Sequence, residues 1–172
     1  QSRRSEQHVT DTRKELVALV PRLRRFAWAL TGSREDGDDL VQAARVKALG
    51  ALHQFQPGTR LDAWMFRILR TQWIDRGRAR QRRNAVHDPA AVEMLSDEGY
   101  AAQAVQARLT LERVRACMAR LPEDQREVLA LVAIEGMSYR ETSETLGVPV
   151  GTVMSRLARA RARLSALMEE PA

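Results

Sequence analysis

The sequence has little of what membrane proteins, disulfide-rich proteins and most enzymes require. It has one cysteine, Cys117, so no internal disulfide can form. No apolar run approaches the length that spans a bilayer, and we expect a cytoplasmic protein without membrane insertion. The histidines His8, His53 and His87 are scattered, and no metal-ligand spacing or glycine-rich phosphate loop is present. We therefore expect no catalytic site, no metal and no cofactor, and we interpret Cys117 as a small buried hydrophobic residue.

Positive charge is plentiful but unevenly distributed. The chain has a net charge of +6 and a pI near 10.6, and its basic residues are almost all arginine. Eight arginines and two aspartates lie between Arg60 and Arg83, and residues 156–163 hold four arginines and no acid. Residues 84–98, in contrast, hold four acids and no Arg or Lys. Two basic regions separated by an acidic spacer predict a protein that binds a polyanion such as nucleic acid. The alternative is a surface that is basic only for solvation.

Helical periodicity dominates the chain, and no segment alternates as a strand would. Apolar residues recur at intervals of three and four from Leu16 to Leu30, and Ser33 with Asp36 predicts the start of a second helix running to about Leu52. Its predicted core residues are Val41, Ala44, Ala48 and Leu52. We predict an all-α chain of two small helical domains, residues 10–83 and 108–170, joined by a flexible acidic linker at 84–107.

The helix predicted to begin near residue 61 has two distinct faces. The expected core stripe comprises Leu61, Trp64, Met65 and Ile68. Phe66, Arg70 and Trp73 fall on roughly the opposite face, where aromatic rings beside an arginine suit stacking on unpaired bases and pairing with phosphates. The alternative is that Phe66 and Trp73 pack beneath a neighbouring helix while Arg70 extends to water.

The C-terminal region predicts a helix-turn-helix. "LPEDQREVLALVAIEG" at 121–136 predicts one helix, and "SYRE" at 138–141 is a capping box for a short helix that ends at Gly147. After "GVPVG", the expected buried stripe of a final helix comprises Val150, Val153, Leu157, Ala160, Leu164 and Leu167. Its expected outer face comprises Thr152, Ser155, Arg156, Arg159 and Arg163. Hydroxyls and arginines near the start of such a helix suit the major groove, where an arginine can bond guanine O6 and N7.

Four motifs, in this order, resemble one family. They are "DDLVQ" at 38–42, "DAWMFRILRTQWIDRGRAR" at 62–80, "LPEDQREVLAL" at 121–131 and "GVPVGTVMSRLARAR" at 147–161. They are similar to the bacterial extracytoplasmic-function sigma factors, the small two-domain initiation subunits of RNA polymerase. The resemblance covers nearly the whole chain. It implies a first domain that binds core RNA polymerase and the melted minus-ten element of promoter DNA, and a second domain that reads the minus-thirty-five element as a duplex.

The resemblance also assigns residues to these roles. The implied core-polymerase contacts are Asp39, Gln42 and Arg45. The implied minus-ten contacts are Phe55, Trp64, Phe66, Arg67, Arg70, Thr71, Trp73, Arg76, Arg78 and Arg80. The implied minus-thirty-five contacts are Thr152, Ser155, Arg156, Arg159 and Arg163. The resemblance further implies an anti-sigma factor that covers the core-binding surface until a signal releases it.

Three positions depart from the family pattern. The family usually has Asn at Thr71, an acid at Ala43 and Lys at Met154, so each change removes a polar contact. We expect an altered base preference at Thr71 and less phosphate contact near Met154. Two other functions stay open: a sigma mimic that sequesters an anti-sigma factor, and a conventional helix-turn-helix regulator that binds an operator alone and usually as a dimer.

Overall fold

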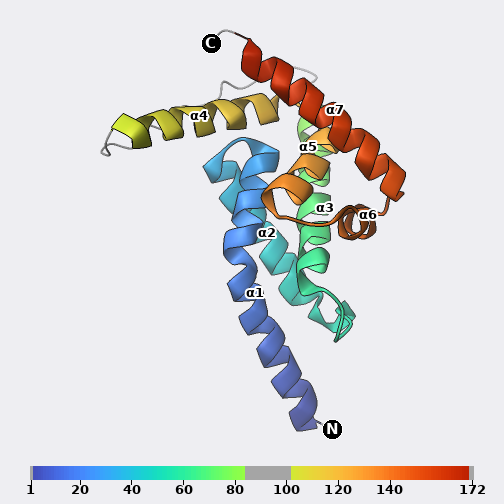
Figure 1. The fold of residues 1–172 in the computed structure, drawn as a ribbon. Coiled ribbons are helices and arrows are strands. Elements are labelled where there is room, and N and C mark those ends of the chain that lie inside the picture. The colour runs from blue at the N-terminus through green and yellow to red at the C-terminus, as the bar shows by residue number, and fades with distance from the viewer. Residues whose placement is uncertain (1, 84–101, 171–172) are drawn as a thin grey trace.

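The computed structural model describes residues 2–83 and 102–170, and those two ranges are helical and contain no strand (Figure 1). Their α-helices are α1 (Ser2–Thr31), α2 (Arg34–Gly50), α3 (Leu61–Arg83), α4 (Ala102–Ala119), α5 (Glu123–Leu129), α6 (Tyr139–Leu146) and α7 (Val150–Glu169). A short 3₁₀ turn, η1 (Leu52–Gln54), follows α2, and a π-helical turn, η2 (Ala130–Ile134), continues α5. The predicted all-α class is confirmed.

Local sequence signals set several helix ends. The Ser33 hydroxyl accepts a hydrogen bond from the Asp36 N–H at 3.2 Å, which caps α2 as predicted. At α6, Ser138 Oγ accepts from the Glu141 N–H at 3.2 Å, and Glu141 Oε2 accepts from the Ser138 N–H at 2.7 Å. The predicted capping box is therefore confirmed. Gly147 ends α6 with φ +67°, a conformation that glycine adopts without strain.

The N-terminal half, α1 to α3, packs as three helices around an apolar core. The predicted core residues Val41, Ala44 and Ala48 are buried, whereas Leu52 lies in η1 and is only partly buried. Gly37 lets α2 approach α1 closely, because a Cβ atom at this position would lie 2.3 Å from Trp28 Cδ1. A larger residue at this position would clash with Trp28 unless the indole or the two helices moved.

The C-terminal half, α4 to α7, is built around the stripe of α7. Val153, Leu157, Ala160 and Leu167 are buried as predicted, and Leu164 is partly buried. The prediction for Val150 is wrong, because its side chain is 40% exposed. Val150 is the first residue of α7 and follows Pro149, so it lies at the edge of this core. The buried stripe begins one helical turn later, at Val153. Cys117 is buried, as expected of a small hydrophobic residue.

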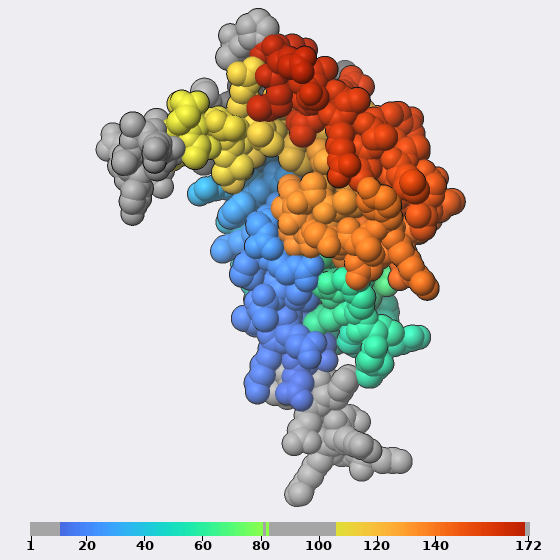
Figure 2. Space-filling model, viewed as in Figure 1, coloured from blue at the N-terminus to red at the C-terminus, as the bar shows by residue number. Residues whose placement is uncertain are grey.

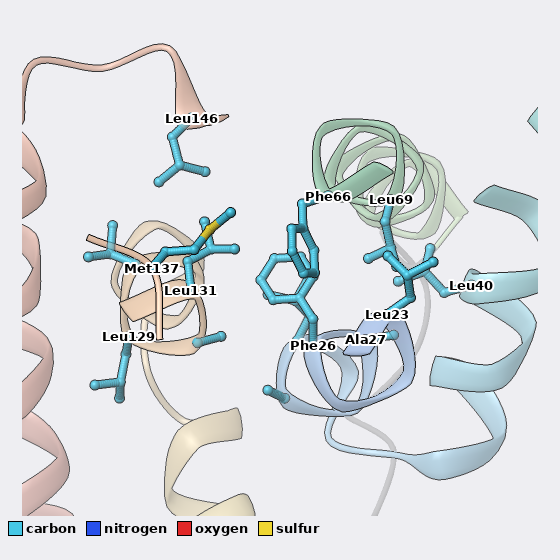
Figure 3. Close-up of a cluster of buried hydrophobic side chains, with 14 of the residues drawn as sticks. Leu23, Phe26, Ala27, Leu40, Phe66, Leu69, Leu129, Leu131, Met137 and Leu146 are labelled. Atoms are coloured by element: carbon cyan, nitrogen blue, oxygen red, sulfur yellow. The ribbon is translucent and has the colours of Figure 1, made fainter. Parts of the chain in front are cut away.

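The two halves pack against one another. Helix α6 contacts α3, and η2, α4 and α5 contact α1 (Figures 1 and 2). Figure 3 shows Phe26 and Phe66 between Leu23 and Leu69 on one side and Leu131 on the other, and all five belong to one continuous buried cluster.

Two sequence expectations remain: where the linker between the halves ends, and whether any helix could cross a membrane. Helix α4 begins at Ala102, inside the 84–107 stretch predicted as linker, and residues 84–101 lie outside the described part of the chain. Among the helices that the structure describes, none combines the length and apolar character needed to cross a membrane.

Candidate nucleic-acid interface

The first candidate surface lies where α2 and α3 meet. Lys47, Trp64, Arg67, Ile68 and Thr71 line an open hollow of about 260 Å³. Helix α3 supplies four of these side chains because positions 64, 67, 68 and 71 recur at intervals of three and four, on one helical face. A hollow with an aromatic wall and two cations can hold a flat anionic group such as a nucleotide.

Of the predicted minus-ten residues, the structure brings Trp64, Arg67 and Thr71 together in this hollow, and Phe55 packs against Trp64. The rings of Phe55 and Trp64 pack with centroids 5.3 Å apart. This contact, from the loop between α2 and α3, helps to hold the Trp64 indole in place. Thr71 Oγ1 donates to the carbonyl oxygen of Arg67 at 2.9 Å. Sequence reasoning missed Lys47, because its place in the hollow depends on the crossing of α2 and α3 and no local motif marks it.

Phe66 does not belong to this surface. Its side chain is 1% exposed and contacts Phe26 edge to face, with ring centroids 5.1 Å apart. The Arg22 guanidinium lies 5.4 Å from the Phe66 ring centroid. The prediction that Phe66 faces a DNA strand is therefore wrong for this structure, and the packing alternative holds. The helical-face argument failed because α3 is covered by neighbours on more than one side.

Arg70 and Trp73 contact the C-terminal half. Arg70 Nε lies 2.9 Å from Glu127 Oε1, and the two side chains are 28% and 3% exposed. Trp73 is partly buried, and the Arg126 guanidinium lies 5.8 Å from its ring centroid. The middle of α3 thus meets α5, so the packing alternative also holds for Trp73. Its expectation that Arg70 extends to water is wrong, because Arg70 pairs with the buried Glu127. The remaining predicted arginines of this helix, Arg76, Arg78 and Arg80, are exposed.

Burial changes the ionisation of the groups at this contact. Burial raises the pKa of Glu127, although the hydrogen bond and charge of Arg70 oppose the rise. Burial likewise lowers the pKa of Arg126, whose guanidinium donates to the carbonyl oxygens of Leu30, Ala119 and Leu121. Arg126 therefore connects the end of α1 to the turn before α5.

A second set of ion pairs joins the halves beside η2. Glu135, whose side chain is fully buried, pairs with Arg22 at 3.1 Å and with Arg25 at 3.5 Å. Arg22 also pairs with Asp62 at 3.1 Å. Burial alone would raise the pKa of Asp62, but hydrogen bonds, including those from Arg60 and Arg22, outweigh burial and lower it.

Three carboxylates of the C-terminal half therefore meet arginines of the N-terminal half, since Arg60 also pairs with Glu141. Sequence reasoning missed all of these contacts. The only available signal was the excess of arginine over acid in the N-terminal half, which does not identify a partner.

The second candidate surface is one exposed face of α2, which carries the predicted core-polymerase residues. Asp39 and Gln42 are exposed, Arg45 is partly exposed, and Arg45 donates to Gln42 Oε1 at 3.2 Å. Val46 and Leu49 continue this face and are 70% and 48% exposed. Sequence reasoning missed both, although the spacing from Gln42 to Val46 to Leu49 places them on one side of the helix. This α2 face therefore combines charged, polar and exposed apolar side chains.

The third surface is the outer side of α7. Ser155, Arg159 and Arg163 are exposed, and Thr152 is partly buried. Arg159 Nε donates to the carbonyl oxygen of Ser155 at 3.2 Å, so its guanidinium lies along its own helix. Arg156 differs from these residues, because it pairs with Asp124 of α5 at 3.3 Å and its side chain is only 23% exposed. Across residues 11–82 and 106–170, no three His, Cys, Asp or Glu side chains gather in a way that could hold a metal.

Comparison with known proteins places both halves of the chain among sigma factor domains. Residues 111–164 match the family model described as Sigma-70, region 4, and residues 16–70 match the Sigma2 domain of PhyR. The chain is 42% identical over 161 residues to the ECF RNA polymerase sigma factor EcfG of Rhodopseudomonas palustris, covering 93% of this chain and 87% of that protein.

Two solved structures are similar in fold. The sigma factor RpoE of Bartonella quintana, in complex with the anti-sigma factor NepR, aligns with a TM-score of 0.77 and 30% identity over 94% of this chain and 99% of that one. The anti-anti-sigma factor PhyR of the same organism, also in complex with NepR, aligns with a TM-score of 0.57 and 18% identity, over 89% of this chain and 49% of that one. The second likeness shows the fold alone. The identity to EcfG over nearly the full length, together with a region 4 helix-turn-helix, shows that this chain belongs to the extracytoplasmic-function (ECF) family of RNA polymerase sigma factors.

Proposed function

We propose that this chain is an alternative sigma factor that binds core RNA polymerase, directs promoter recognition, melting and transcription initiation, and is held inactive by an anti-sigma factor. The observation that carries the proposal is the presence of two separate basic surfaces, the hollow on α3 and the outer side of α7, in a chain of this family. It would act in the cytoplasm as a subunit of the polymerase, with no catalytic chemistry of its own.

Each half would contribute one part of promoter recognition. Residues 10–83 would hold an unpaired base of the minus-ten element in the hollow beside Trp64 and Thr71, because stacking offsets the cost of extruding the base. Residues 108–170 would place α7 in the major groove of the minus-thirty-five element. Each half would bind weakly alone, and the tether between them would raise the effective concentration of the second contact.

The α2 face is the proposed polymerase-binding surface. Asp39 and Gln42 would provide polar contacts, and the exposed Val46 and Leu49 would provide apolar area to bury. An anti-sigma factor that covers this face would prevent polymerase binding. The similarity to a sigma factor solved with NepR supports a partner of this kind.

A sigma mimic is the second candidate function, and one observation favours it. Residues 16–70 match the Sigma2 domain of PhyR, and PhyR is described as an anti-anti-sigma factor. A mimic would bind an anti-sigma factor but would not drive transcription. The intact basic surfaces on α3 and α7 favour the sigma factor, since a mimic has no use for DNA contacts.

The deciding experiment is run-off transcription with purified core RNA polymerase on a pooled promoter library, with and without this chain. We expect transcripts that depend on the chain and share two spaced upstream elements. Asp39→Lys should reduce both polymerase binding and transcription, whereas Asp11→Lys, the same charge change at an exposed position of α1, should leave both unchanged. Stable anti-sigma binding without polymerase binding would favour the mimic, and tight binding to an operator by the chain alone would favour a conventional regulator.

A further inference from the structure

Helix α7 has two flanks of different chemistry. One flank carries Thr152, Arg159 and Arg163, which are polar or basic. The other flank begins with Val150 and Met154, which are one helical turn apart and have side chains 40% and 52% exposed. Two neighbouring apolar side chains therefore stand in the open in the first two turns of α7, whose other exposed residues are small, polar or charged and include Arg161 on this same flank, two turns beyond Met154.

The fold does not require these two side chains. The packed stripe of α7 begins at Val153, which is completely buried, and continues through Leu157 and Ala160. Val150 and Met154 lie beside this stripe, in the first two turns of the helix. In a helix-turn-helix, those turns are the part of the second helix that reaches the base edges.

The chemistry of the major groove selects the contact that such a pair can make. Most groups on the base edges are hydrogen-bond donors or acceptors, which an apolar side chain would strip of water without replacing the bond. The one apolar group is the 5-methyl of thymine. We propose that Val150 and Met154 contact a thymine methyl in the duplex promoter element and thereby require thymine at that position. This inference rests on the proposed function.

The two flanks then divide the work of recognition. Contacts between the arginines and phosphates orient the helix and weaken as salt rises, because they depend on counterion release. A contact between methionine, valine and a methyl group involves no charge, so its discrimination is independent of salt. Met154 would therefore contribute to the choice of base without contributing to the salt-dependent part of the affinity.

The test replaces thymine by uracil, a change that removes only the methyl group. The holoenzyme, formed from this chain and purified core polymerase, is used to select an upstream element from a random duplex library. Each thymine of that element is then replaced singly on either strand. At one or two positions we expect about three- to fivefold weaker binding, with the same ratio at low and high salt.

Two variants assign the effect to this flank. Met154→Gln keeps the length of the side chain but makes it polar, and it should abolish most of the uracil penalty. Because Met154 is half exposed, this variant should fold as the parent does, which circular dichroism would check. Arg163→Gln changes the other flank and should weaken binding in a salt-dependent way while keeping the uracil penalty.

The outcomes separate this inference from the proposed function. A selected element without thymine, full tolerance of uracil at every position, or a penalty unchanged in Met154→Gln would overturn the inference while the sigma factor function stands. Failure to obtain any polymerase-dependent transcript or selected element would overturn both.

Discussion

Helices α3 and α7 are both rich in arginine, yet the structure uses their arginines differently. In the middle of α3, Arg70 is paired with the buried carboxylate of Glu127 from the other half of the chain. On α7, the paired arginine is Arg156, whose partner Asp124 belongs to its own half, and Arg159, Arg161 and Arg163 are exposed, as are Arg76, Arg78 and Arg80 of α3. The difference arises from position, since α3 lies at the junction of the two halves whereas the outer side of α7 faces away from it (Figure 1).

Charge composition alone therefore does not identify a binding surface. A phosphate approaching Arg70 would have to compete with Glu127, which already occupies the guanidinium. A phosphate approaching Arg159 meets an exposed side chain. With the halves packed together, Arg159 is open to a phosphate, whereas the Arg70 guanidinium is already paired with a carboxylate of the other half.

The largest expected effect tests whether the middle of α3 is an interior surface. Phe66→Ala removes a ring that is 1% exposed and should lower the free energy of unfolding by about 3–5 kcal/mol, because it leaves a cavity beside Phe26. Met154→Ala, at an exposed apolar position of α7, should change it by less than about 0.5 kcal/mol. Urea unfolding measures both. Equal effects would show that Phe66 is not in the core.

The next effect concerns the contact between the halves. Arg70→Ala should weaken their association by about 1.5–3 kcal/mol, because it leaves the buried Glu127 carboxylate without its ion-pair partner. Arg159→Ala, which removes the same side chain from α7, should have no effect on association. Small-angle X-ray scattering would report an increased radius of gyration for the first variant only, and an unchanged radius for Arg70→Ala would contradict the role assigned to this pair.

The association of the two halves should also depend on pH, through Glu127. Burial raises the pKa of Glu127 above its ordinary value of 4.5. Glu127 therefore holds its proton more tightly when the two halves are in contact (the closed arrangement) than when they are apart (the open arrangement). Closure is therefore most favourable below pH 4.5 and weakens as the pH rises through the raised pKa, by at most about 1.4 kcal/mol per pH unit. Arg70 and Arg156 reduce this shift and Glu123 increases it.

Glu127→Gln should remove that pH dependence, because glutamine does not titrate. Glu144→Gln, on a side chain that is 63% exposed and paired only along α6, should preserve it. Scattering measured across pH 4 to 7 separates the two variants. Identical pH profiles for Glu127→Gln and the parent chain would show that Glu127 does not titrate at the contact.

The smallest expected effect on stability, though not on DNA binding, comes from α7. Arg159→Ala should leave the free energy of unfolding within about 0.5 kcal/mol of the parent, because the side chain is exposed. In the holoenzyme it should weaken binding to all promoter sequences and reduce the slope of log affinity against log salt by about one. Lys14→Ala, an equal loss of charge on α1, is the control and should leave the slope unchanged.

Much of the architecture follows from local sequence. Ser33, the "SYRE" capping box and Gly147 mark helix ends through hydrogen bonds between residues three to five positions apart, and the structure confirms each of them. The stripe of α7 from Val153 onward follows from the helical period in the same way. Such signals can be predicted from the sequence because the partners are close in the chain.

The candidate site was predictable only in part. Trp64, Arg67 and Thr71 share one face of α3 and were all identified, but Lys47 completes the hollow from another helix. The prediction for Phe66 assumed that the helix has only one buried side. In the structure, α3 packs against α1 and also contacts the C-terminal half.

The all-α class, several helix ends, the two basic regions and the family follow from the sequence alone, because these depend on spacing within short segments and on motifs in order. Only the tertiary structure decided which of those basic residues are exposed and which are paired. Arg70 with Glu127, and Arg22 with Glu135, join residues far apart in the chain. Their pairing depends on how two helical halves pack, and short-range periodicity contains no information about that packing.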